Sequence, residues 1–217
     1  MTTTLRHSLT GYSALFMITT AIVVSLLTFN AEGDTNAQNQ PLTGDATAIF
    51  AGGCFWCVES DFDHVEGVTE TISGFTGGAL ENPTYNGNHE GHYEAVQITY
   101  DADVVSYEQL LHAFFRSIDP LDAGGQFCDR GFAYKTAVFA DDAQRDAAEA
   151  AKAQASRDLN AQVVTEVLPM AAFWPVDGYH QNYYMTNRAR YEYYRNGCGR
   201  DRRVLELWGD AAPFAKK

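Results

Sequence analysis

Residues 47–59 of the chain are TAIFAGGCFWCVE, and this stretch decides the predicted fold. The run from Thr47 to Ala51 is apolar apart from its first residue, which predicts a short buried strand. Gly52 and Gly53 then break the strand and allow a sharp turn. The residues from Cys54 to Asp63 have a helical pattern. The stretch therefore predicts a strand that turns directly into a helix, with a cysteine at the junction.

The junction cysteine, Cys54, is expected in the first turn of that helix. Unpaired backbone N–H groups and the helix dipole stabilise an anion there, and a thiolate with a lowered pKa is the reactive form of cysteine. Phe55 and Trp56 follow directly. Because adjacent helix positions face different ways, at least one of these rings is expected to line a pocket beside the sulfur. On this motif alone, an inert cysteine buried at a helix start is the alternative interpretation.

The rest of the chain alternates between strand and helix patterns. Strand patterns occupy residues 68–73, 94–100, 135–140 and 163–168. Helical patterns occupy residues 107–117, with Ser106 as the expected N-cap, and 141–159. This order predicts a single α/β domain, an α+β sandwich with a mixed, partly antiparallel sheet flanked by helices. After Pro175 the pattern weakens, so we expect an irregular C-terminal tail with one short helix near residues 179–186.

The composition narrows the class of protein. The 217 residues are 46% hydrophobic and 13% aromatic, which is typical of a globular domain. The net charge of −13 argues against a nucleic-acid surface, since phosphate contacts need clustered Lys and Arg. Four cysteines are too few for a disulfide scaffold in a chain of this length. With one CxxC pair among them, redox or metal chemistry fits better.

An uncharged apolar run, YSALFMITTAIVVSLLT, occupies residues 12–28 and is followed by a polar segment without pattern. It predicts a signal peptide or membrane anchor over residues 1–37, a linker over 38–46 and the catalytic domain over 47–217. The residues after the apolar run do not distinguish a cleaved signal peptide from an uncleaved anchor, and cleavage is slightly favoured. Either alternative predicts an exported domain, periplasmic or anchored to the membrane facing the periplasm. A redox cysteine there needs a dedicated reducing partner.

The stretch GCFWCVE resembles the active-site signature of the peptide methionine sulfoxide reductase A family, and further short motifs follow in the family's order. They are GFTGG at 74–78, NPTY at 82–85, GHYE at 91–94, Asp119-Pro120, QFCDRG at 126–131 and GCGR at 197–200. The resemblance covers about residues 48–209. It implies a peptide-methionine (S)-S-oxide reductase that acts on methionine S-sulfoxide in proteins and on the free amino acid. No bound cofactor and no metal are expected.

The same resemblance implies roles for individual residues. Cys54 would attack the sulfoxide sulfur, release methionine and become a sulfenic acid. Glu94 would be the general acid that protonates the leaving oxygen, and burial among aromatic rings would raise the pKa of such a carboxyl. The implied substrate-binding residues are Phe55 and Trp56 around the methyl group, Tyr85 and Tyr134 at the oxygen, and Asp129, which would position the site.

A second thiol must condense with the sulfenic acid. Cys198, which lies between two glycines, resembles the family's resolving cysteine. Cys57 and Cys128 remain alternative resolving cysteines. The resulting disulfide would be reduced by thioredoxin or a thioredoxin-like protein, and we expect a monomer that repairs oxidised proteins under oxidative stress.

Two other functions remain open at this point. A thioredoxin-like dithiol-disulfide oxidoreductase would use the Cys54–Cys57 pair, since a CxxC at a strand-to-helix junction fits that class. Thiol exchange needs no acid at Glu94, so a Glu94→Gln variant separates the two activities. A structural zinc module using the cysteines or His89 and His92 is the weaker alternative, because the isolated cysteines lack the spacing of most zinc sites.

Overall fold

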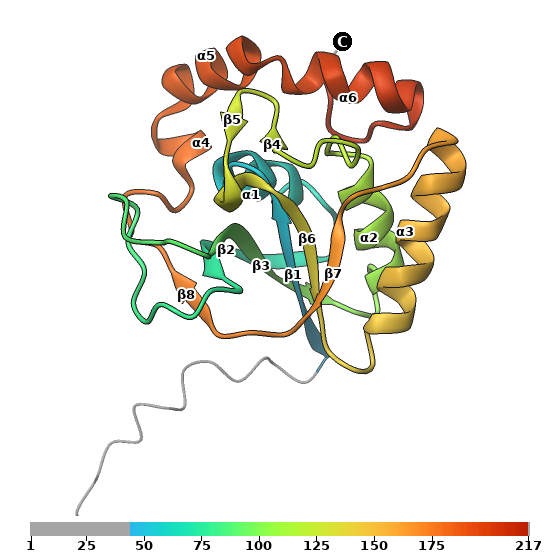
Figure 1. Ribbon diagram of the computed structural model, residues 1–217, viewed down its shortest axis with the longest axis horizontal. Coiled ribbons are helices and arrows are strands. Elements are labelled where there is room, and N and C mark those ends of the chain that lie inside the picture. The colour runs from blue at the N-terminus through green and yellow to red at the C-terminus, as the bar shows by residue number, and fades with distance from the viewer. Residues whose placement is uncertain (1–43, 217) are drawn as a thin grey trace, which may run out of the picture. The chain divides into compact units, whose positions relative to one another are not determined.

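A computed structural model describes residues 44–216, and a six-stranded sheet forms the centre of the domain (Figure 1). The order of the strands is β7-β6-β1-β3-β2-β8. Their bounds are Asp45–Gly52 (β1), Val68–Thr76 (β2), Tyr93–Asp101 (β3), Thr136–Ala140 (β6), Glu166–Pro169 (β7) and Phe173–Pro175 (β8). Only β6 and β7 pair in parallel among these strands; the other neighbours are antiparallel. The predicted mixed sheet within one domain is confirmed.

The central strand β1 is apolar because both of its faces are covered. Side chains alternate between the two faces of a strand, and Phe50 faces a large core in which its ring stacks on Phe114 at 4.7 Å between centroids. Ile49 and Ala51 face a smaller core on the opposite side, together with Phe139. The TAIFA run thus fills two cores, which explains why it lacks the polar alternation of a strand with one solvated face.

Three helices that the sequence predicts cover the larger core: α1 (Phe55–Phe62), α2 (Tyr107–Phe115) and α3 (Arg145–Leu159). The N-terminus of α2 is closed by a capping box. The hydroxyl of Ser106 accepts the backbone N–H of Gln109, whose side chain accepts the backbone N–H of Ser106. The predicted N-cap is therefore confirmed.

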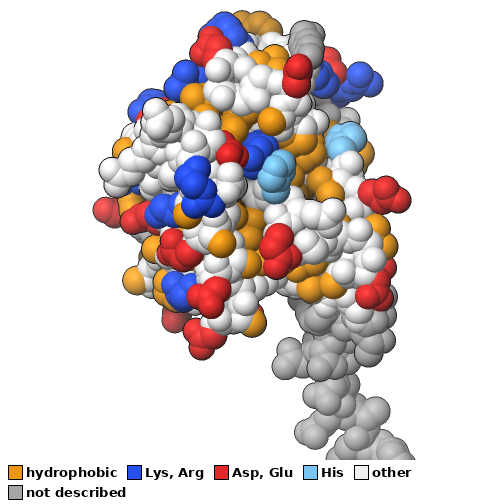
Figure 2. Space-filling model, turned by 90° about the vertical axis from the view of Figure 1, so that its right-hand side faces the viewer, with side chains coloured by type: hydrophobic (Ala, Val, Ile, Leu, Met, Phe, Trp, Pro, Cys, Tyr) orange, Lys and Arg blue, Asp and Glu red, His pale blue; other side chains and the backbone are white. Residues whose placement is uncertain are grey.

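The exposed residues of α3 are charged, small or, at Gln154, polar. Arg116, at the end of α2, forms an ion pair with Asp158 of α3. Acidic and basic side chains are interleaved over the face that carries these helices (Figure 2). This pattern is that of a solvated surface.

The prediction of an irregular C-terminal tail is wrong. The tail forms α4 (Tyr183–Thr186), α5 (Arg188–Cys198) and α6 (Arg200–Trp208), which lie across the end of the domain above α1 (Figure 1). The buried positions of α5 and α6 include Arg195, Arg200 and Asp201. Arg195 binds Asp61 of α1 and Asp201, each at 2.7 Å. Because charged residues interrupt the buried positions Tyr191, Val204 and Trp208, a search for hydrophobic periodicity does not detect this face.

The first described strand begins at Asp45, so the last two residues of the predicted linker, Asp45 and Ala46, belong to the sheet. The predicted leader over residues 1–37 and the rest of the linker lie outside the described residues. Within residues 44–216, no helix combines the length and apolar character needed to span a bilayer.

Candidate active site

The turn between β1 and α1 places Cys54 at the N-cap of the helix. Gly53 has a φ of +83°, and a Cβ atom at this position would lie 2.6 Å from Cβ of Gln126. Only glycine satisfies both the left-handed backbone and this close approach. The carbonyl of Cys54 accepts the backbone N–H of Cys57 at 3.1 Å and so starts the helix. The glycine turn therefore fixes the cysteine where the strand becomes a helix.

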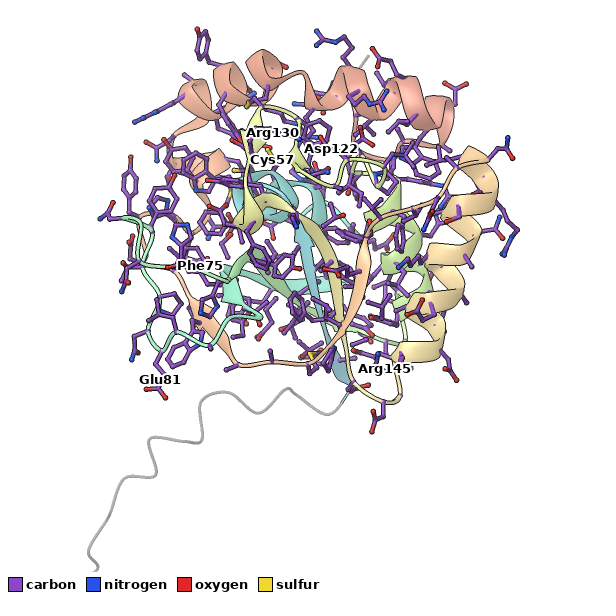
Figure 3. All side chains as sticks on the ribbon, viewed as in Figure 1. Cys57, Phe75, Glu81, Asp122, Arg130 and Arg145 are labelled. Carbon is purple, nitrogen blue, oxygen red and sulfur yellow. A yellow bond between two sulfur atoms is a disulfide. The ribbon has the colours of Figure 1, made fainter. Side chains whose placement is uncertain are left out.

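Cys54 and Cys57 form a buried pair of free thiols, only 6% and 2% exposed, with Cys57 on α1 in the interior of the domain (Figure 3). Their sulfurs are hydrogen-bonded to each other. Burial, and then the neighbouring Cys57, raises the pKa of Cys54, opposite to the lowered pKa expected from the helix N-terminus alone. The hydrogen bond from Cys54 lowers the pKa of Cys57 to about 7. The negative charge of the pair is therefore favoured at Cys57, which accepts a hydrogen bond from Cys54.

Glu94 of β3 is a buried carboxyl beside this pair, 2% exposed. Its Oε2 accepts the backbone N–H of Phe55 at 3.1 Å, and its carboxylate is hydrogen-bonded by the Tyr134 side chain. Burial nevertheless dominates and raises the pKa of Glu94 to about 8, with the nearby Asp129 carboxylate adding to the shift. At neutral pH Glu94 is therefore mostly protonated and can donate a proton.

Aromatic rings form the wall next to Cys54. Phe55 is fully buried and packs edge-on against Phe75 of β2 at 5.8 Å between centroids. Trp56 is half-buried, and its indole stacks on Tyr183 of α4 at 3.9 Å. Tyr85 stacks on Phe55 at 6.1 Å, and burial raises the pKa of Tyr85 to about 12, so its phenol stays a neutral donor. The site thus combines an apolar wall with neutral hydrogen-bond donors.

His180 supports this wall and was not assigned to the site from the sequence. The indole N–H of Trp56 donates to Nδ1 of His180 at 3.3 Å, and the imidazole packs on Tyr85 at 3.9 Å between centroids. Burial lowers the pKa of His180, which keeps Nδ1 available as an acceptor. The imidazole therefore fixes the orientation of both rings.

Tyr194 is a second site residue that the sequence did not reveal. Its hydroxyl, on α5, lies within hydrogen-bonding reach of the Cys54 sulfur and donates to the carboxylate of Asp129. Burial raises the pKa of both Tyr194 and Asp129. Asp129 is thus placed to orient the tyrosine that faces the nucleophile. One tyrosine among twelve, in a segment predicted to be irregular, carried no signal in the sequence.

The other two cysteines form a disulfide, Cys128–Cys198, with a Cα–Cα distance of 4.9 Å. Cys128 is exposed at the tip of a hairpin made by β4 (Gly125–Gln126) and β5 (Asp129–Arg130), and Cys198 is the last residue of α5. The family resemblance implied that Cys198 pairs with Cys54. In the structure, Cys198 pairs with Cys128, and the thiol next to Cys54 is that of Cys57.

The residues considered for a zinc site have other partners. Cys128, Asp129 and Cys198 are the group in residues 44–216 whose ligand atoms lie close enough for a metal. However, the two sulfurs are bonded to each other, so neither is a thiolate ligand. Both ring nitrogens of buried His92 are hydrogen-bonded to backbone, with the N–H of Gly78 and the carbonyl of Leu80. The ring of His89 stacks on Phe75, so this histidine also has a partner within the protein.

A free dithiol in an aromatic pocket, a protonated carboxyl beside it and a more exposed disulfide define a thiol-dependent oxidoreductase. The sequence profile of the peptide methionine sulfoxide reductase family matches residues 46–212. The chain therefore belongs to this family, and its relatives are of the A type. It is an oxidoreductase that reduces methionine sulfoxide, which confirms the predicted family and activity.

The most similar relatives agree over nearly the whole described domain. Peptide methionine sulfoxide reductase MsrA 2 of Rhizobium meliloti is 55% identical over 76% of this chain and 84% of its own length. MsrA 2 of Caulobacter vibrioides is 47% identical over 75% of this chain and 85% of its own length. Among solved structures, methionine sulfoxide reductase A of Corynebacterium diphtheriae matches 69% of this chain and 77% of its own, with a TM-score of 0.62 and 28% identity.

Proposed function

We propose that Cys54 attacks the sulfur of methionine S-sulfoxide in oxidised proteins, while Glu94 protonates the oxygen. The observation that carries this proposal is a buried carboxyl, Glu94, whose pKa burial raises to about 8 and which lies beside the Cys54 thiol and accepts the N–H of Phe55. A sulfoxide oxygen leaves readily only when it is protonated, and a general acid with a pKa near the working pH is best suited to the task. The preference for the S epimer comes from the family resemblance.

A single-turnover assay tests this function. Prereduced protein without its first 43 residues is mixed with each epimer of dabsyl-methionine sulfoxide, with no reductant added. We expect methionine from the S epimer and none from the R epimer. Methionine from the R epimer would contradict the proposed stereochemistry, and no methionine from either would contradict the proposed site.

The protons balance within the site. When Cys54 attacks, its thiol proton passes to the Cys57 thiolate, and the proton of Glu94 goes to the sulfoxide oxygen. Methionine leaves and Cys54 becomes a sulfenic acid. The Cys57 sulfur then attacks the Cys54 sulfur and expels the hydroxyl group as water, with the proton that Cys57 received. The products are methionine, water, a Cys54–Cys57 disulfide and ionised Glu94.

Resolution by Cys57 is supported by the contact between the two sulfurs, whereas Cys198 is already bonded to Cys128. We expect Cys57→Ser to slow the first methionine release, because Cys57 takes the proton of Cys54, and to prolong the lifetime of the Cys54 sulfenic acid about tenfold or more, because the adjacent thiol is lost. Trapping with dimedone and peptide mapping measure this directly.

The double variant Cys128→Ser/Cys198→Ser is the matched control, since it removes two thiols but keeps Cys57. It should form a Cys54–Cys57 disulfide after one methionine and give no dimedone adduct. A persistent sulfenic acid in this control, together with a Cys54–Cys198 disulfide in Cys57→Ser, would return the resolving role to Cys198.

A protein of the thioredoxin class is the proposed external reductant. Cys128 is exposed and Cys198 is half-exposed, whereas Cys54 and Cys57 are buried, so a protein thiol reaches the outer pair more readily. Reduced Cys128 and Cys198 would take over the inner disulfide and become the bond seen in the structure. Cys198→Ser should then stall after its first turnover with thioredoxin, and continued cycling would contradict this route.

We also propose, from the apolar run at residues 12–28 alone, that the protein is exported and repairs methionine outside the cytosol. Cell fractionation with an intact-mass measurement tests this proposal. Recovery of the full-length chain in the cytosol would contradict it.

A further inference from the structure

A groove of about 420 Å³ lies between two segments at one edge of the sheet. One wall is the loop Asn82–Tyr85, which belongs to the connection between β2 and β3, and the other is the chain Trp174–Asp177 at the end of β8. Both segments lie at the left edge of the domain in Figure 1. None of the catalytic steps above uses this groove.

The groove and the aromatic wall beside Cys54 share one side chain, that of Tyr85. Tyr85 lines the groove and also stacks on Phe55 and Trp56, at 6.1 and 6.2 Å. The carboxyl of Glu94 and the sulfur of Cys54 both raise the pKa of Tyr85, which places its phenol close to the reacting groups. Tyr85 thus lies between the reacting groups and the groove, which is where a residue next to a bound methionine sulfoxide would be placed.

The walls are ordered and mainly apolar. Pro83 and Val176 are buried, and the Trp174 side chain is half-buried, so its indole presents part of its surface to the groove. The loop wall is held in place because the N–H of Thr84 donates to the carbonyl of Asn88 at 2.7 Å. Such a preformed, apolar groove suits a side chain of similar character.

One acidic group lies at this surface. Asp177 is exposed, and its Oδ1 accepts the N–H of Tyr179 at 3.1 Å, which fixes the carboxylate at the groove. The net charge of the chain, −13, adds to the negative potential. An acidic neighbour in the substrate is therefore disfavoured relative to a basic one.

We propose that this groove binds the residue next to the oxidised methionine in a peptide, with preference for a large apolar side chain and against an acidic one. The inference rests on the proposed function, because it needs methionine sulfoxide in the Cys54 pocket. Trp174 and Asp177 are then specificity-determining residues, while the chemistry stays at Cys54 and Glu94.

Steady-state kinetics on three blocked substrates test the proposal: N-acetyl-methionine S-sulfoxide amide and the same unit with Phe on its N-terminal or its C-terminal side. The blocked amino acid does not extend into the groove and serves as the internal reference. The wild-type protein should prefer one Phe substrate, and Trp174→Ala should lower that preference roughly tenfold, mainly through KM. Val104→Ala, an exposed valine next to Gly67, is the matched control and should keep the wild-type ratio.

A charge reversal at Asp177 gives a second test that leaves Trp174 and its packing unchanged. Two further substrates carry Lys or Glu in place of Phe. The Asp177→Lys variant should change the ratio of their kcat/KM values by roughly twofold or more in favour of the Glu substrate. Equal losses on all substrates, or no preference in the wild-type protein, would overturn the groove proposal. Failure of the wild-type protein to reduce even the blocked amino acid would instead overturn the proposed function.

Discussion

Cys54→Ser is expected to abolish methionine sulfoxide reduction, with a loss of more than about 10⁴-fold in the single-turnover rate. A serine hydroxyl has neither the nucleophilicity of sulfur nor the ability to accept oxygen as a sulfenic acid. The site contains a second buried thiol, Cys57, but its place within α1 puts it one helical turn beyond the nucleophile's N-cap position. The readout is methionine formed per enzyme from prereduced protein.

Cys128→Ser is the control for this variant, since it also removes one cysteine but leaves the buried pair intact. It should release the first methionine at the wild-type rate. Substantial activity in Cys54→Ser, or equal losses in the two variants, would contradict the assignment of Cys54 as the nucleophile.

Glu94→Gln should slow the first turnover by about 10²–10⁴-fold, which is the usual contribution of a general acid. The amide keeps the size of the carboxyl and accepts the N–H of Phe55, but it has no proton to give to the sulfoxide oxygen. Alkylation of the thiols by iodoacetamide should still occur. Stopped-flow measurement of the first turnover, on the wild type and the variant, gives the ratio.

The pH dependence supplies a second signature of Glu94. An acid acts in its protonated form, and burial raises the pKa of Glu94 to about 8, so the acid is present below that pH and lost above it. The wild-type first-turnover rate should therefore fall as the pH rises through about 8. Glu94→Gln should lack this decline. An unchanged first-turnover rate in the variant would contradict the assignment of Glu94 as the general acid.

The parts of the fold that the sequence predicts are those with a local cause. The glycine pair before Cys54 predicts the turn because only glycine adopts the φ of +83° found at Gly53. The capping box at Ser106 is equally local, since both partners lie within one turn of helix. For these elements a short window of residues contains the whole physical reason.

The parts that were missed depend on contacts between distant residues. Helices α5 and α6 bury Arg195, Arg200 and Asp201 together with apolar residues, so their inner faces lack a clear hydrophobic pattern in the sequence. Arg200, for example, donates to the carbonyls of Gly52 and Ser117, 148 and 83 residues away. These partners are known only once the chain has folded.

The active-site residues likewise divide into those that the sequence predicts and those that it does not. Family resemblance led to Cys54 and Glu94, and the structure brings them together, although their roles stay predictions. It did not lead to His180 or Tyr194, which reach the site from the tail. Nor did it indicate that Cys198 would bond to Cys128, because a hairpin tip and a helix end meet only in three dimensions.

The outer disulfide also changes how firmly the domain holds its fold. It links residues 70 positions apart, and a cross-link over a loop of that length restricts the unfolded chain enough to stabilise the native state by about 4 kcal/mol. In the proposed cycle, reduction by a partner would remove that restraint. The fully reduced form would therefore unfold at a lower temperature than the form with the Cys128–Cys198 bond, whose Cys54 and Cys57 thiols are already free for another turnover.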